Sequence, residues 1–114
     1  MTAAVDVDAS ANNGTISFSS TINNDDSGTA RNLILDTGAG SITVSGVIGD
    51  VGNSGVAIGT IDINNSDGAG TITLAGIGSS TTAGNAGTVD IGNTATADLN
   101  LEGTFFTGGA TTYQ

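Results

Sequence analysis

The stretch Leu33-Ile34-Leu35-Asp36-Thr37-Gly38-Ala39-Gly40-Ser41-Ile42-Thr43-Val44-Ser45-Gly46-Val47-Ile48 decides the fold, because the rest of the chain aligns to it as copies. It contains a short apolar strand, a glycine-containing turn, an alternating strand and a final apolar pair. The same order occurs four times, and the copies begin at equal intervals, at Val5, Leu33, Ile61 and Val89. A fixed period of this kind is typical of stacked repeats, in which each unit buries its apolar face only against a neighbour.

Apolar and polar residues alternate within each copy, and this period of two indicates β-strands. The abundant glycine, threonine, serine and asparagine are poor helix formers. Alternation places the aliphatic residues of both strands on one side, which predicts a single closed interior lined by aliphatic columns. The expected columns contain Val5/Val7, Leu33/Leu35, Ile61/Ile63 and Val89/Ile91 from the first strands and Ile16/Phe18, Ile42/Val44, Ile72/Leu74 and Leu99/Leu101 from the second.

Two all-β architectures fit such strands. An antiparallel sandwich does not need a repeating sequence. In a solenoid, equivalent strands of successive copies lie in register about 4.8 Å apart, so equivalent positions must accept each other as neighbours. The constant period therefore predicts a parallel β-helix (β-solenoid) of about four coils of about 28 residues each, with residues 1–114 as one segment. The fourth copy reaches Gln114 before position 117, where a fifth is due, so we expect a fragment of a longer array.

The composition excludes several functional classes. The net charge is −10 and Arg31 is the one basic residue, so nucleic acid and anionic membrane surfaces are not expected partners. No stretch approaches the roughly 18 apolar residues of a membrane-spanning helix. The chain has no histidine and no cysteine, which excludes a histidine-supported nucleophile.

The segments 34–46 and 70–76 resemble the repeats of very large bacterial surface proteins of the filamentous-haemagglutinin and autotransporter adhesin type. The resemblance implies a right-handed parallel β-helix, secretion to the cell surface, and a role as adhesin or spacer. It transfers no catalytic residue and no cofactor. A host glycan or surface is a partner that the resemblance suggests, so we expect an extracellular structural or adhesive segment and no enzyme.

Outward carboxylates provide the main alternative, a carbohydrate-binding or carbohydrate-cleaving β-helix. Asp6, Asp62 and Asp90 occupy equivalent outward positions of the first strand. In-register stacking would place Asp62 and Asp90 about 5 Å apart, near the separation of a retaining carboxylate pair. A solvated polar face explains the same residues more simply.

Calcium is the more plausible use of these oxygens. Carboxylate and amide oxygens of neighbouring coils are ligands that Ca²⁺ accepts, and a cation would relieve their mutual repulsion. The sequence contains neither the nonapeptide calcium repeat nor an EF-hand loop. The candidate ligands are Asp8, Asp36 and Asn64, or Asp62 and Asp90.

A strip of hydroxyl groups is predicted on the outer side of the second strand. It contains Ser17, Thr43 and Thr73, with Thr15, Ser41 and Thr71 beside them. Asp98 and Asn100 interrupt the strip in the fourth copy. A flat threonine array on a solenoid can bind ice, which is a further alternative. An ordinary hydrogen-bonded ladder is the simpler interpretation of an interrupted strip.

The ends of the stack carry no recognisable cap, because no helix, proline or lysine cluster covers them. We therefore expect the chain to associate end to end with itself or to depend on flanking repeats. Return segments such as 23–32 and 49–57 would be presented on the side of the rod. Alternation also predicts that one ring of the pair Phe105 and Phe106 lies in the core.

Overall fold

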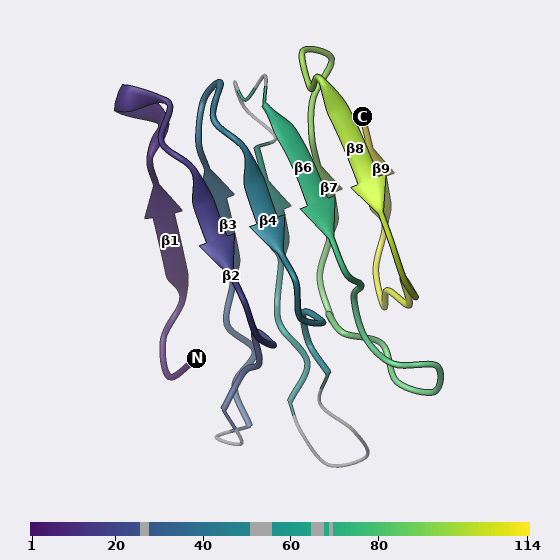
Figure 1. Cartoon of the computed structure of the whole chain (residues 1–114). Coiled ribbons are helices and arrows are strands. Elements are labelled where there is room, and N and C mark those ends of the chain that lie inside the picture. Colours follow the sequence, from purple (N-terminus) through teal and green to yellow (C-terminus); the bar gives the residue numbers. More distant parts are fainter. Residues whose placement is uncertain (26–27, 51–55, 65–67, 69) are drawn as a thin grey trace.

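The computed structural model describes residues 1–25, 28–50, 56–64, 68 and 70–114, so both return segments named above lie partly outside the described residues. The described part forms nine strands and one short 3-10 helix, η1, arranged as a stack of coils (Figure 1). The elements are β1 (Val5–Asp8), η1 (Ser10–Asn12), β2 (Ile16–Phe18), β3 (Leu33–Asp36), β4 (Ile42–Val44), β5 (Ile61–Ile63), β6 (Thr71–Leu74), β7 (Val89–Ile91), β8 (Asp98–Leu101) and β9 (Thr111–Tyr113).

The strands form two parallel sheets, and each coil contributes one strand to each. The first sheet has the order β1-β3-β5-β7-β9 and the second has the order β2-β4-β6-β8. Successive strands pair at the positions that the repeat predicts, because Leu33 pairs with Val5 and Ile61, and Ile61 pairs with Val89. The predicted all-β parallel solenoid is therefore confirmed.

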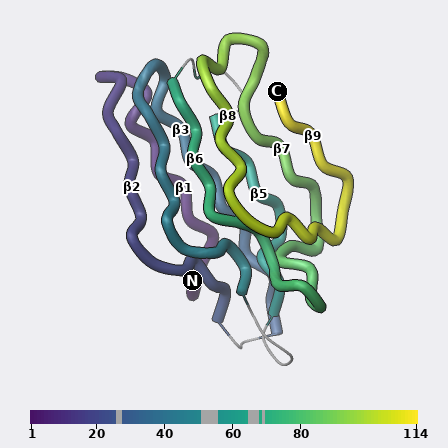
Figure 2. Tube along the Cα trace, turned by 45° about the vertical axis from the view of Figure 1, so that its right-hand side comes forward, coloured from purple at the N-terminus to yellow at the C-terminus, as the bar shows by residue number. Residues whose placement is uncertain are grey.

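A third side of the coil is built from single residues rather than strands. Ile22, Ile48, Ile77 and Phe105 follow one another through isolated parallel bridges. A further bridge joins Ile58 to Asn85, so the return segment adds its own stacked position in two coils. Figure 2 shows these coils stacked side by side along one axis, with the N-terminus at the first coil and the C-terminus at the last.

The core is the closed interior of the coils. Aliphatic residues of one column cover those of the next, so the inner coils exclude water from both sheets and from the third side. Among the described residues, the fully buried aliphatic side chains are those of Leu33, Leu35, Ile42, Val44, Ile48, Ile58, Ile61, Ile63, Ile72, Leu74, Ile77, Val89 and Ile91.

One corner of the coils requires glycine. A Cβ atom on Gly70 would overlap the carbonyl oxygen of Gly40, and one on Gly40 would overlap that of Gly14. Successive backbones approach closely there because the strands on either side stay in register. The glycines of this corner thus permit the stacking of coils.

The fourth coil differs from the expectation of four equal coils. β9 begins at Thr111, which pairs with Val89, so the next strand starts earlier than position 117, where the repeat places it. The missing residues come from the return segment after Phe105. Gly108 crosses directly beneath Asn85 and donates a hydrogen bond from its N–H to the Asn85 side-chain oxygen at 3.1 Å. The solenoid therefore has three coils of the full repeat length and a shorter fourth.

Candidate functional site

The outward positions of the first sheet form a column that contains carboxylates and one apolar side chain. Asp62 and Asp90 pair in register, which is the arrangement predicted for them. Asp6 is separated from them, because it pairs with Ile34 and Ile34 pairs with Asp62. Two neighbouring carboxylates on a strand face can hold a cation or a proton. Glycoside hydrolysis would also require that the pair flank a bound sugar.

A second carboxylate pair lies where β1 and β3 end. Asp8 and Asp36 are register partners. Asp8 accepts a hydrogen bond from the Ser10 N–H at 2.9 Å, and Asp36 accepts one from the Gly38 N–H at 3.3 Å. The Ser10 hydroxyl and then the Ser10 backbone lower the pKa of the Asp8 carboxyl below its ordinary value. Both carboxylates thus support the local turn that follows their strand.

Asn64 is directed into the protein and not toward a surface cation. Its φ is +50°, and only 1% of the residue is exposed. Its side-chain oxygen accepts hydrogen bonds from the Thr37 N–H at 2.7 Å and the Thr37 hydroxyl at 3.2 Å. Its side-chain N–H group donates to the same hydroxyl at 3.0 Å. The amide therefore clamps the turn of the preceding coil.

The predicted calcium ligands are brought together only as two separate pairs, Asp8 with Asp36 and Asp62 with Asp90. Within the described residues, no three acidic, histidine or cysteine side chains gather as metal ligands would. Calcium binding stays a prediction, and its best remaining geometry is a carboxylate pair completed by water.

The hydroxyl strip lies where the sequence predicts it. Ser17 pairs with Thr43, Thr43 with Thr73, and Thr73 with Asn100. The Asn100 side-chain N–H group donates a hydrogen bond to the Thr73 hydroxyl at 3.4 Å. In the fourth coil, the Asn100 amide therefore continues the hydrogen-bonded ladder of the strip.

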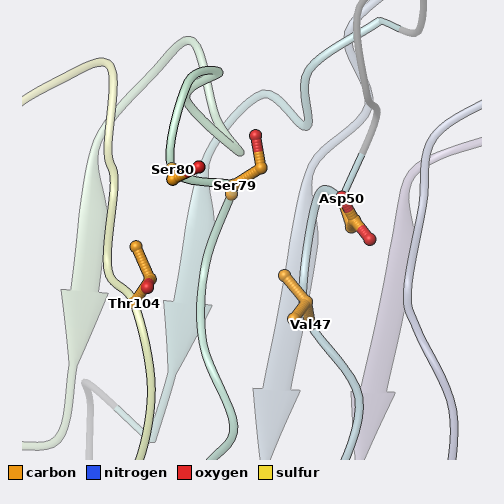
Figure 3. A pocket seen from close by; sticks show the side chains of 6 residues that line it. Val47, Asp50, Ser79, Ser80 and Thr104 are labelled. Atoms are coloured by element: carbon orange, nitrogen blue, oxygen red, sulfur yellow. The ribbon is translucent and has the colours of Figure 1, made fainter.

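A groove that the sequence did not predict lies on the third side of the solenoid (Figure 3). It has a volume of about 320 Å³ and crosses three successive coils. The second coil contributes Val47 and Asp50, the third Gly78 to Ser80, and the fourth Thr104. Asp50 carries the charge of the lining, and the other polar side chains are hydroxyl groups. No sequence motif marked this site, because its residues belong to three different copies and to segments of unequal length.

The described residues include no helix of the length and apolarity that a membrane span requires. No protein-family model matches the sequence, and the comparisons with curated proteins and with solved structures return no match. The function therefore rests on the fold and on the surfaces described above.

Proposed function

We propose that this chain is a structural and adhesive segment of an extracellular, rod-forming β-solenoid protein of the bacterial surface, that it has no enzymatic activity, and that it assembles through its end faces. The single observation that carries the proposal is an apolar interior built by in-register stacking, with β1, β2, β8 and β9 as the outer strands of the two sheets in the described part of the chain. The repeat style of segments 34–46 and 70–76 supports the surface-protein assignment, because these segments resemble the repeats of large bacterial adhesins.

The C-terminal end exposes residues that belong to core columns. Leu101 continues the column of Val44 and Leu74, both fully buried, yet it is 38% exposed. Tyr113 continues the column of Ile63 and Ile91 and is 40% exposed. Leu101 and Tyr113 are exposed because β8 and β9 are the outer strands of the two sheets at this end. A further coil would therefore bury both side chains and extend both sheets.

The N-terminal end offers the complementary surface. β1 and β2 each have one paired neighbour, so their outer edges carry unpaired backbone groups. Val7 and Phe18 occupy the same two columns as Tyr113 and Leu101 and are only partly buried. Stacking β9 on β1 of another copy would place Tyr113 over Val7 and Leu101 over Phe18. Such a head-to-tail contact does not close and produces filaments.

Light scattering across a concentration series tests this assembly. We expect the mass of the particle to rise with protein concentration, and the variant Leu101→Lys to remain monomeric. The matched control is Ile34→Lys, because Ile34 is 37% exposed but lies on the side of the stack. A particle that is monomeric at every concentration, or equal association in both variants, would contradict the proposal.

Polysaccharide cleavage is the second candidate, favoured by the register that places Asp62 beside Asp90. Neither residue lines the groove, and the chain has no histidine to share the chemistry. A reducing-end assay on neutral and acidic polysaccharides separates the two functions. Cleavage that disappears in the variant Asp90→Asn would establish the enzyme and refute the non-enzymatic proposal.

A further inference from the structure

The groove on the third side runs along the axis of the solenoid rather than along its strands. Its residues come from coils two, three and four. Coils two and four are separated by two stacking steps, or about 10 Å. Figure 3 shows Val47 and Asp50, Ser79 and Ser80, and Thr104 on three neighbouring segments. An extended ligand that lies across the coils would therefore contact all three segments together.

The central segment of the groove is held rigidly. Gly78 has a φ of +71°, and its N–H donates to the Ile48 carbonyl oxygen at 2.8 Å. A Cβ atom there would lie 2.6 Å from the Phe106 carbonyl oxygen, so only glycine fits. The next residue starts a turn, because the Thr82 N–H donates to the Ser79 hydroxyl at 3.1 Å and the Ser79 N–H donates to the Thr82 carbonyl oxygen at 2.9 Å. The turn thus fixes the Ser79 hydroxyl group at the wall of the groove.

The wall from the second coil is also supported from within the stack. The Asn23 side-chain N–H group donates to the Asp50 carbonyl oxygen at 3.1 Å, which ties Asp50 to the first coil. The Asp50 side chain is exposed. An ionised carboxylate can accept hydrogen bonds at both oxygens and so can bind two neighbouring hydroxyl groups of one ligand.

The lining combines three hydroxyl side chains, one carboxylate and the apolar side chain of Val47. Hydroxyl groups that donate and accept hydrogen bonds, together with the apolar Val47 side chain, match a molecule that carries both hydroxyl groups and apolar C–H patches. The net charge of −10 disfavours an anion.

We propose that this groove binds a neutral saccharide chain aligned with the solenoid axis. Asp50 accepts hydrogen bonds from sugar hydroxyl groups, Ser80 and Thr104 donate to and accept from the next ring, and Val47 contacts its apolar side. The volume of about 320 Å³ is at the lower end of the range for small-molecule sites, about 300 to 1,000 Å³, which fits a short oligosaccharide segment. The inference deepens the adhesive part of the proposed function and rests on it.

The test is a titration of the isotope-labelled chain, followed by amide NMR shifts, with maltose, cellobiose, lactose and chitobiose as neutral probes and digalacturonate as the anionic probe. We expect at least one neutral disaccharide to shift the amides of Asp50, Ser80 and Thr104. The variant Asp50→Ala should weaken this binding about tenfold or more, because it removes hydrogen bonds to a charged acceptor. Thr104→Val should weaken it by a smaller factor.

Asp6→Ala is the matched control, since Asp6 is an exposed carboxylate on the first sheet, away from the groove. The proposal is overturned if no neutral probe shifts the groove amides, if digalacturonate alone does so, or if Asp50→Ala binds as the control does. Unchanged amide spectra outside the groove show that a variant is folded. Saccharide binding by a strictly monomeric particle would refute the end-to-end assembly alone, and filaments that bind no saccharide would refute the groove alone.

Discussion

The clamp between Asn64 and Thr37 gives the sharpest prediction of stability. Replacing Asn64 by alanine removes the oxygen that accepts the N–H of the fully buried Thr37. An unsatisfied buried donor costs about 1–3 kcal/mol. The φ of +50° adds about 1–2 kcal/mol for a residue that carries a Cβ and has no local polar group. We therefore expect Asn64→Ala to lower the free energy of unfolding by about 2–5 kcal/mol.

Asn64→Gly separates the two contributions, because glycine tolerates the backbone conformation and lacks only the amide. We expect it to be less destabilising than Asn64→Ala. Urea unfolding followed by circular dichroism measures both. Asn100→Ala is the control, since the exposed Asn100 makes one long hydrogen bond at the surface, and its loss should change stability by less than about 0.5 kcal/mol.

The reasoning is refuted if Asn64→Ala unfolds at the urea concentration of the wild type. A different outcome would revive the metal-ligand hypothesis. If Asn64 instead binds calcium, the wild type melts at a higher temperature in calcium and the Asn64→Ala variant loses that increase.

Two further predictions concern the buried core and the loss of folding stability at low pH. Ile72→Ala should destabilise the chain by about 2–5 kcal/mol, because it opens a cavity in a fully buried column. Ile34→Ala, on the exposed side of the first sheet, should cost far less. Thermal melts of the two variants check this, and equal losses of stability would contradict the closed core. The pKa of Asp8 is lowered in the folded state, so its contribution is present above the ordinary value of 3.8 and is lost as the pH falls through the lowered value. Melts between about pH 2 and pH 5 should therefore show a shallower acid loss for Asp8→Asn than for the wild type, and identical slopes would show that the Ser10 hydrogen bonds do not stabilise the fold.

The sequence predicted the stacked columns because they depend on a local pattern repeated at a constant spacing. Leu35, Ile63 and Ile91 recur at that spacing and do lie directly over one another in the structure. The short fourth coil was not predicted, since Thr111 is polar and does not resemble the apolar residues that start the other coils. Its position is set by Gly108, which lets the return segment pass close beneath Asn85.

The candidate site residues were harder to predict for a physical reason. Asn64 ends an alternating strand, and its positive φ turns the side chain inward, against the face that simple alternation assigns to neighbouring polar residues. The groove depends on the return segments, whose lengths vary between coils. Only the three-dimensional stack shows that Asp50, Ser79 and Thr104 share one surface.

The shortened fourth coil makes the two ends of the described solenoid different in shape. Because the residues are lost on one side only, the perimeter at Tyr113 is smaller than the perimeter at Val5, and a partner seated there would meet a step beside Asn85. The two faces of a head-to-tail joint would then match over both sheets and leave a notch on the third side. Along a filament of such joints, these notches would recur at regular intervals on one side. That side would be regularly indented and the opposite side would be smooth.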